Sequence, residues 1–543
     1  MASKHGFKGM SSAPVADAVV LPSSSQSRLW QFQLGSHQQL SSLWQCRMSV
    51  TRFPVRSASK TLAVNIAATL AWVLLAASLP PRVARSEMPI STTAAVPTAA
   101  VPTASLPSVA VPTAAVTTAS IAAAATIPMT ATPMAASPME VLPAEALAGV
   151  ERPAVLPGGD RGSLVIMGGS ERFQNRVIWE EIVRRAGGRG SRIAVFPTAS
   201  GNPQVDGEDF ARILNNEGAD AFVVPIARSF PVNPELAARD PQVAASVRQA
   251  TGVFFVGGSQ TRIRQALVGP AGEDTPVLQA IRAVYRDGGV IAGTSAGAAV
   301  MSRVMFRSPP TVLNTMLNGV TMGREIDHGL GFLDSDWFVD QHCLVRGRFA
   351  RTLVAMREQG IDFGVGVDED TALVVAGDEA RVIGHKGVLL FDLSQAEVDE
   401  NQSAFNIRNA RLSYLDRGDR LNLRTAAITA SAEKLAGRRI EPNSPDFRPR
   451  FRNRPVFNDI LGNMAVHDLM VRLIDNRYSE GLGLAFDGAA ALMGPTPGFE
   501  FRFYRSVDSA AWQTEAFGGD DYTIAHIHLD VTPVQLIGPL YTK

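Results

Sequence analysis

Four short apolar runs that end in glycine or small polar residues constrain the fold of this chain more than any other feature. Stretches with helical periodicity separate them, and near-continuous apolar strands between amphipathic helices are typical of a parallel sheet covered on both faces. The sequence therefore predicts a doubly wound α/β fold from about residue 161 onward. The four runs are SLVIMGG (163–169), RIAVFPTAS (192–200), GVFFVGGSQ (252–260) and GVIAGTSAG (289–297).

The carboxyl ends of these strands are where a ligand is expected, because open α/β sheets bind ligands beyond those ends. The ends are Gly168-Gly169, Thr198 to Ser200, Gly257-Gly258 and Thr294-Ser295. Chemically active side chains are therefore expected at these positions, and in loops that reach the same edge of the sheet.

Ser295 lies at the centre of the sequence Gly-Thr-Ser-Ala-Gly, between a predicted strand and a helix-compatible segment. A serine hydroxyl reacts only when it is exposed and paired with a base, and a strand-to-helix elbow supplies the exposure. N–H groups near such an elbow stabilise a developing oxyanion, and Ala296 and Gly258 are the candidate donors. The alternative is a strand-to-helix turn with a capping serine.

His342 stands out among the eight histidines because of its surroundings. It ends an apolar strand that begins at Trp337. Arginines form forked hydrogen bonds with carboxylates, and an acidic residue such as Asp340 can pair with a guanidinium. The alternative for the arginines is a solvated helix face. The segment reads WFVDQHCLVRGRFAR, with arginines at 346, 348 and 351.

Four motifs occur in a fixed order between about residues 161 and 400: FVGGSQ, GTSAGA, DQH followed by R-x-R-x-x-R, and GVDEDTAL. This combination resembles the cyanophycinases, of the peptidase S51 group. The resemblance implies a doubly wound, mostly parallel sheet of the flavodoxin-like or class I glutamine amidotransferase-like kind. It also implies hydrolysis of cyanophycin, a poly-aspartate chain with arginine on each side-chain carboxylate, to β-Asp-Arg dipeptides. No cofactor or metal is implied.

The resemblance further implies residue roles. Ser295 would be the nucleophile, His342 the general base and Glu369 the carboxylate that orients the histidine. From the residues alone, Asp368 and Asp370 are alternatives to Glu369. The expected partner is cyanophycin or an Asp-Arg peptide, and a homodimer is left open. The positions tied to substrate binding or pocket structure are Gln260, Asp340, Gln341, Arg346, Arg348 and Arg351.

Three other functions compete with this interpretation. An α/β-hydrolase esterase would use the order Ser295, Glu369, His385, although no HGGG-type motif is present and His385 sits in a hairpin-like GHKGV turn. A non-catalytic binding protein of the same fold is the second. A peptidase that acts on short Asp-X peptides is the third.

The first 150 residues differ in composition from the rest. An uncharged apolar core at 62–79, preceded by basic residues, predicts an export signal within 1–86 and a secreted or periplasmic protein. The signal-like segment has a usual length if Met48 is the start. Contact with a membrane is expected only if this segment is retained. Residues 87–150, rich in Ala, Pro and Thr, predict a disordered linker.

The remaining chain divides into a hydrolase domain at 151–400 and a C-terminal extension at 401–543. In the extension we expect strands in ARLSYLDRGDRLNLRT and TIAHIHLDVTPVQL and a helix in MAVHDLMVRLIDNRYSE. His526 and His528 lie two apart on a strand pattern but lack further ligands at metal-binding spacing, which favours a plain strand face.

Charge and cysteine content exclude other classes. With 51 basic and 51 acidic residues, the chain lacks the basic excess that nucleic-acid binding requires. The two cysteines cannot form a disulfide framework, and Cys343 is expected to pack as a small buried side chain.

Overall fold

The computed structural model describes residues 161–333 and 336–537. The predicted export signal and linker lie outside the described residues. Among the helices that are described, none combines the length and the apolar character needed to cross a membrane.

The first sheet contains the four strands expected from the apolar runs. Its nine strands have the order β15-β14-β11-β10-β1-β5-β4-β2-β3. The five strands from β1 to β3 in this order are parallel, as predicted, but the other four add antiparallel to the β1 edge, so the sheet is mixed. The bounds are β1 Ser163–Met167, β2 Arg192–Phe196, β3 Asp220–Val223, β4 Gly252–Phe255, β5 Val290–Thr294, β10 Thr371–Ala376, β11 Glu379–Gly384, β14 Arg420–Asn422 and β15 Ile428–Thr429.

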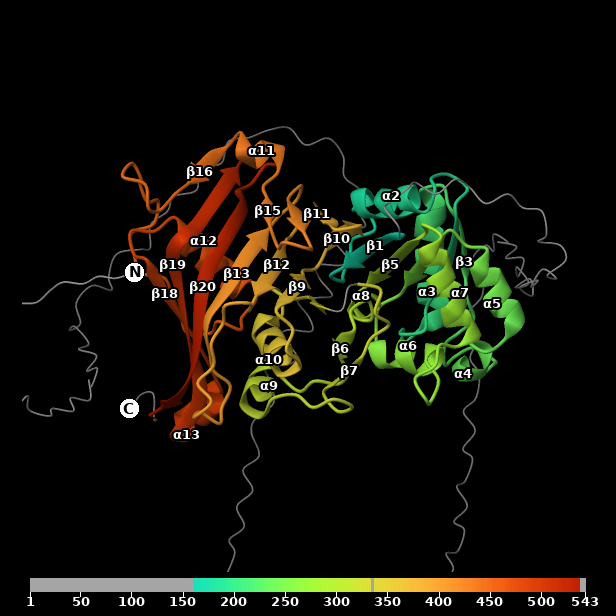
Figure 1. Cartoon of the computed structure of the whole chain (residues 1–543), viewed down its shortest axis with the longest axis horizontal. Coiled ribbons are helices and arrows are strands. Elements are labelled where there is room, and N and C mark those ends of the chain that lie inside the picture. The colour runs from blue at the N-terminus through green and yellow to red at the C-terminus, as the bar shows by residue number, and fades with distance from the viewer. Residues whose placement is uncertain (1–160, 334–335, 538–543) are drawn as a thin grey trace, which may run out of the picture. The chain divides into compact units, whose positions relative to one another are not determined.

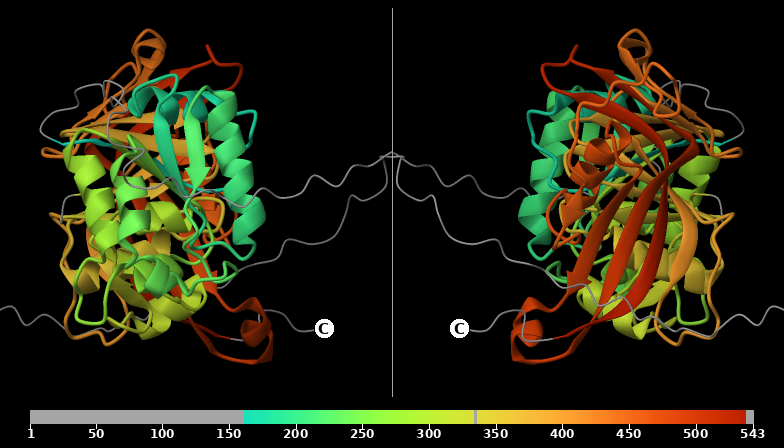
Figure 2. Two further views of the ribbon diagram at one scale, coloured as in Figure 1. Left: turned by 90° about the vertical axis from the view of Figure 1, so that its right-hand side faces the viewer. Right: turned by 90° about the vertical axis from the view of Figure 1, so that its left-hand side faces the viewer.

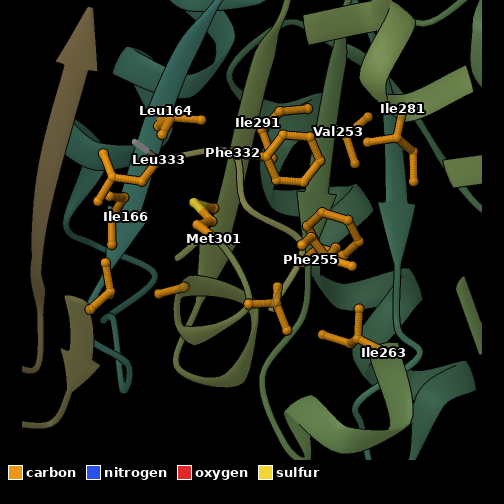
Figure 3. Close-up of a cluster of buried hydrophobic side chains, with 14 of the residues drawn as sticks. Leu164, Ile166, Val253, Phe255, Ile263, Ile281, Ile291, Met301, Phe332 and Leu333 are labelled. Atoms are coloured by element: carbon orange, nitrogen blue, oxygen red, sulfur yellow. The ribbon is translucent and has the colours of Figure 1, made fainter. Parts of the chain in front are cut away.

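Both faces of this sheet are covered, because alternate side chains of each strand point to opposite sides. Leu164 and Ile166 enter the core drawn in Figure 3, whereas Val165 and Met167 enter the core on the other face. The helices α5–α8 contribute to the first core, and α2 and α3 to the second. The helix bounds are α2 Arg176–Arg185, α3 Pro203–Asn216, α5 Pro241–Arg248, α6 Gln260–Leu267, α7 Pro276–Arg286 and α8 Ala296–Ala299.

A second sheet of nine strands is mainly antiparallel. Eight of its strands have the order β17-β18-β19-β20-β13-β12-β9-β8, and β16 pairs with β19. Only the pairs β8–β9 and β17–β18 are parallel. The bounds are β8 Trp337–Gln341, β9 Phe363–Val367, β12 Val388–Asp392, β13 Ile407–Leu415, β16 Arg438–Ile440, β17 Val456–Phe457, β18 Glu480–Phe486, β19 Thr496–Thr514 and β20 Asp521–Leu536.

The predicted border at residue 400 does not separate two sheets, because it falls between the paired strands β12 and β13. Strands β8, β9 and β12 also join the two parts through their side chains. Val339 and Val365 enter the core of the first sheet, whereas Phe338 and Phe391 enter the core of the second. The second core is completed by α10, Phe349–Gln359, and α12, Ala465–Ile474.

The expected strands and helix of the extension correspond to β13, β14, β20 and α12. The sequence analysis missed β19, which at 19 residues is longer than β20 at 16 residues. Figures 1 and 2 show β19 and β20 running side by side toward α13. The remaining elements are α4 Pro234–Ala237, β6 Val304–Phe306, β7 Ile326–His328, α9 Val312–Asn318, α11 Ala432–Leu435 and α13 Gly488–Met493.

The GHKGV segment is not a hairpin, which corrects the sequence-based interpretation. It joins β11 to β12, and these strands belong to different sheets. The segment therefore carries the chain from the first sheet to the second.

The shared strands predict that both sheets unfold together. Phe501 is fully buried in the second core, so Phe501→Ala should lower the free energy of unfolding by about 3–5 kcal/mol. Calorimetry should show one transition that moves to lower temperature. The control Val507→Ala changes a side chain that is 91% exposed and should leave the midpoint in place. Two transitions, of which only one moves, would contradict a single cooperative unit.

Candidate active site

Ser295 occupies the sharp turn between β5 and α8, as the sequence predicted. Its φ of 53° is a left-handed conformation that non-glycine residues rarely adopt. Two glycines make the turn possible: a Cβ at Gly293 would lie 2.4 Å from Gly297 O, and a Cβ at Gly297 would lie 2.3 Å from Phe255 O. The hydroxyl is therefore held on a constrained backbone at the carboxyl end of the sheet.

His342 follows β8, a strand of the second sheet, yet its side chain reaches Ser295. The distance from His342 Nε2 to Ser295 Oγ is 2.9 Å. The imidazole packs on the backbone at Gly169, where an added Cβ would lie 2.2 Å from the ring. His342 itself has a φ of 50°.

Glu369 lies in the tight connection between β9 and β10. Its Oε1 is 2.7 Å from His342 Nδ1, on the opposite side of the imidazole from Ser295. Three side chains from three loops therefore form one continuous hydrogen-bonded chain. Of the two flanking alternatives, Asp368 accepts from the Val345 N–H and Asp370 accepts from Arg172 and Asn175, so neither takes this position.

Backbone hydrogen bonds to the end of β1 fix the three loops. The carbonyls of Met167, Gly168 and Gly169 accept in turn from the N–H groups of Ser295, His342 and Asp370, each at 3.0 Å. Asp370 is the neighbour of Glu369. One short segment, from the last residue of β1 to Gly169, thus positions all three side chains.

The electrostatic environment favours a neutral imidazole. Burial and the nearby Arg346 lower the pKa of His342 to about 4, against the opposing effect of its hydrogen bond to Glu369. Burial also acts to raise the pKa of Glu369, but the His342 hydrogen bond and the Lys386 and Arg346 charges hold it below its ordinary value. Near neutral pH the pair is therefore a carboxylate and an uncharged imidazole, and Nε2 is able to accept the Ser295 proton.

The two candidate oxyanion donors flank the serine. Ala296 is the first residue of α8, and Gly258 lies at the end of β4 with a φ of 133°. A Cβ at Gly258 would lie 2.2 Å from Ala199 O, so only glycine fits there. Within the described part of the chain, neither N–H donates to a backbone carbonyl, as expected for donors directed at a ligand.

Gln341 and Arg348 lie directly beside the serine. Arg348 Nη1 donates to Gln341 O at 2.9 Å and to Gln341 Oε1 at 2.8 Å, and that Oε1 is 3.4 Å from Ser295 Oγ. Burial and the neighbouring Arg351 lower the pKa of Arg348 to about 10, so its guanidinium remains charged near neutral pH. Both residues are placed to border the reacting group.

Asp340 and Arg351, which the sequence tied to substrate binding or pocket structure, form an ion pair with each other inside the protein. Arg351 donates to both carboxylate oxygens of Asp340, at 2.8 and 2.6 Å, and Thr352 donates to it as well. The two charged side chains are 1% and 6% exposed. Asp340 is therefore not free to receive a substrate guanidinium, and the pair holds β8 to α10. Gln260 likewise donates to Phe306 O at 2.6 Å and so holds the start of α6 to β6.

Two cationic side chains lie on the solvent-exposed side of Glu369. Arg346, predicted from the sequence, has a guanidinium nitrogen 3.6 Å from Glu369 Oε1. Lys386 was missed, because it lies in a loop with no family motif, and its Nζ is 3.7 Å from Glu369 Oε2. Their side chains are 49% and 36% exposed. Both can reach a ligand.

The other candidates lie away from this arrangement. The His385 N–H donates to Asp370 O and the residue lines a groove with Arg176 and Arg381, so the structure does not bring it to Ser295. His526 and His528 both contact Asp508, and the described residues contain no cluster that could hold a metal ion. Cys343 is fully buried, and burial raises the pKa of its thiol.

Comparison with known proteins gives a match to one family model and to curated relatives. Residues 164–383 match the model of peptidase family S51. The chain is 33% identical over 279 residues to a cyanophycinase of Synechococcus elongatus, covering 50% of this chain and 82% of that protein. It is 32% identical over 283 residues to a cyanophycinase of Geminocystis herdmanii, covering 49% of this chain and 95% of that protein. The solved structure of a peptidase from an acI-B1 Actinobacterium is 20% identical in sequence, with a TM-score of 0.36. The match covers 49% of this chain and 98% of that chain.

The buried ion pair predicts a large effect on stability. Arg351→Ala leaves the Asp340 carboxylate buried without its partner and should lower the free energy of unfolding by about 3–5 kcal/mol. Arg346→Ala removes a half-exposed arginine from the same segment and should change stability by less than about 0.5 kcal/mol. Urea unfolding of both variants measures the difference. Equal stability of the two would show that the pair does not support the fold.

Proposed function

The chain belongs to peptidase family S51 and is a serine peptidase, and from this premise we propose that it hydrolyses cyanophycin with Ser295 as its nucleophile. The observation that supports this most is the hydrogen-bonded chain from Ser295 Oγ through His342 to Glu369, at 2.9 and 2.7 Å. The choice of substrate rests on the match to cyanophycinases. Cyanophycin is a poly-aspartate chain with arginine joined to each side-chain carboxylate.

The proposed reaction proceeds through an acyl-enzyme. Ser295 Oγ attacks the scissile carbonyl carbon and its proton passes to His342 Nε2. Glu369 stabilises the imidazolium, and the N–H groups of Gly258 and Ala296 donate to the oxyanion. The C–N bond breaks as His342 returns the proton to the leaving amine. Water, deprotonated by the same imidazole, then releases the acyl product and restores the serine.

The site environment suits a substrate that carries carboxylates. Arg346 and Lys386 are exposed cations beside Glu369, and Arg348 lies next to Gln341 at the serine. Arginine recognises a carboxylate through two parallel hydrogen bonds, which lysine cannot reproduce. We assign substrate contact to these residues, and a supporting role to Asp340, Arg351 and Gln260.

The esterase alternative has little support, because its base, His385, makes no described contact with Ser295. Release of β-Asp-Arg dipeptides and secretion are further parts of the proposal. The first rests on the family resemblance, and the second on the apolar segment 62–79 with its basic flank.

The identity of the base is tested by two histidine variants. His342→Ala should lower kcat on cyanophycin by about 10³-fold or more, because it removes the proton acceptor. The matched control His385→Ala should remain near wild type. Soluble dipeptide released by the full chain is the readout, with Ser295→Ala as the inactive reference. Loss of activity in His385→Ala alone would favour the esterase order of residues.

The substrate is tested by comparing polymers. The full chain should cleave arginine-bearing cyanophycin quickly and bare poly-aspartate very slowly. This expectation rests on the match to cyanophycinases, whose substrate carries arginine: a site that pairs with a polar group of its substrate is left with unpaired groups when an analogue lacks it, at a cost of roughly 1–3 kcal/mol each. Rates of amine release from both polymers measure this. Equal rates, or ester hydrolysis without cleavage of either polymer, would overturn cyanophycin as the substrate.

A further inference from the structure

Glu171 is a buried acidic residue near the site that neither the sequence motifs nor the proposed mechanism uses. It lies in the loop after β1 and is 9% exposed. Its Oε1 accepts from the Gly169 N–H at 2.7 Å, and its Oε2 accepts from the Thr294 hydroxyl at 2.5 Å. These partners are 125 residues apart in the numbering but meet on one carboxyl group.

Each partner supports one member of the hydrogen-bonded chain. The backbone at Gly169 lies against the imidazole of His342, and Thr294 directly precedes Ser295 in the elbow. A carboxylate that holds both therefore links the surface on which the imidazole rests to the turn that presents the hydroxyl. A shift of about 1 Å between such groups costs on the order of 10²-fold in rate, so this link has a direct bearing on reactivity.

We propose that Glu171 is a positioning residue that, as a carboxylate, clamps the nucleophile elbow to the end of β1 and so sets the geometry between Ser295 and His342. The inference deepens the proposed function and rests on it. Glu171 does not touch the reacting atoms. It acts through Thr294 and Gly169.

The ionised form is required because both partners donate. The Gly169 N–H cannot accept a hydrogen bond, so a protonated Glu171 would carry its hydrogen on Oε2, and the Thr294 hydroxyl would have to accept instead of donate. The Thr294 hydrogen would then lose its acceptor in a buried site. Protonation of Glu171 therefore weakens the contact that holds the elbow.

The surroundings make this protonation accessible near neutral pH. Among the described residues no arginine or lysine forms an ion pair with Glu171, and burial, together with the charge of Asp370, raises its pKa to about 7. The hydrogen bonds from Thr294 and Gly169 oppose that shift. The nearby charged and titratable groups are Asp370, which Arg172 neutralises from its other side, and His342 beyond Gly169.

A rise in pH affects the clamp and the stability of the fold in opposite directions. The clamp forms as pH rises through the Glu171 pKa of about 7 and is lost as pH falls through it. Because the folded-state pKa lies above the ordinary value of 4.5, the native state holds the proton more tightly, and stability falls as pH rises toward 7. The site therefore becomes more reactive where the fold becomes less stable. A group with only a structural role would not give this opposition.

The test follows the modification of Ser295 by phenylmethylsulfonyl fluoride, measured by intact-mass spectrometry of the full chain from about pH 5 to about pH 9, on either side of the Glu171 pKa. In this reaction Ser295 Oγ bonds to sulfur, fluoride leaves and the hydroxyl proton passes to His342. The rate reports nucleophile activation without any peptide substrate. His342, with its pKa of about 4, does not titrate in this range.

The wild-type rate should rise near pH 7. Glu171→Gln keeps its oxygen on the Gly169 N–H but presents an amide donor to Thr294, so it should lose the rise and react about tenfold more slowly at pH 8. Its thermal midpoint at pH 8 should not be lower than that of the wild type, because a buried charge has been removed. The control Glu181→Gln changes another buried carboxyl, which pairs with Arg184, and should keep the wild-type rate and rise.

Thr294 variants keep the inference testable if Glu171→Gln folds poorly. Thr294→Val removes the donor and with it the contact between Glu171 and the elbow, so it should react more slowly and lose the rise, whereas Thr294→Ser keeps the hydroxyl and should behave like the wild type. A reactive wild type beside a Glu171→Gln variant with the same rate and the same pH rise overturns the inference alone. A folded wild type that is never modified at Ser295 defeats the proposed function, and the inference with it.

Discussion

Three consecutive backbone carbonyls at the end of β1 determine the geometry of this site. The carbonyls of residues 167–169 accept the N–H groups of Ser295, His342 and Asp370. Each of three separate loops is thus fixed directly to the end of one strand. A displacement of one loop therefore does not move the other two. The arrangement requires glycine at 168 and 169, since a Cβ at Gly168 would lie 1.8 Å from Asp368 O.

The same contacts maintain an unfavourable backbone. Ser295, His342 and Asp370 all have positive φ values, between 50° and 55°. Such conformations cost of order 1–3 kcal/mol each and persist only where the surroundings impose them. Here each strained residue donates its N–H to β1, and the second sheet fixes His342 and Glu369 from behind through β8 and β9. The second sheet is therefore part of the site, because it supplies the strands that end at the base and its carboxylate.

The sequence predicted the parts of this site that depend on local pattern. Apolar runs that end in glycine or small polar residues located four strands of the first sheet, and the family motifs pointed to Ser295, His342 and Glu369. It did not predict that β12 and β13 are neighbours, because antiparallel pairing over a distance leaves no local periodicity. Glu171 and Lys386 were missed for a related reason. Each acts through residues that are close only after folding, and a lone acidic or basic residue in a loop has no distinguishing signal.

Burial explains why residues that share one motif divide into two roles. Arg346 and Arg351 are five positions apart, but only Arg351 is enclosed, with its guanidinium over the Phe306 ring and on both oxygens of Asp340. If Arg351 left Asp340 to bind a ligand carboxylate, the Asp340 charge would remain unpaired in a low-dielectric interior. Such an unpaired buried charge costs several kcal/mol. Weak binding of a ligand carboxylate cannot offset that cost. The exposed Arg346 has no such constraint, since water already solvates it. We therefore expect the partly exposed cations to recognise a charged ligand at this site, while the enclosed pair holds β8, which ends at the His342 loop, to α10.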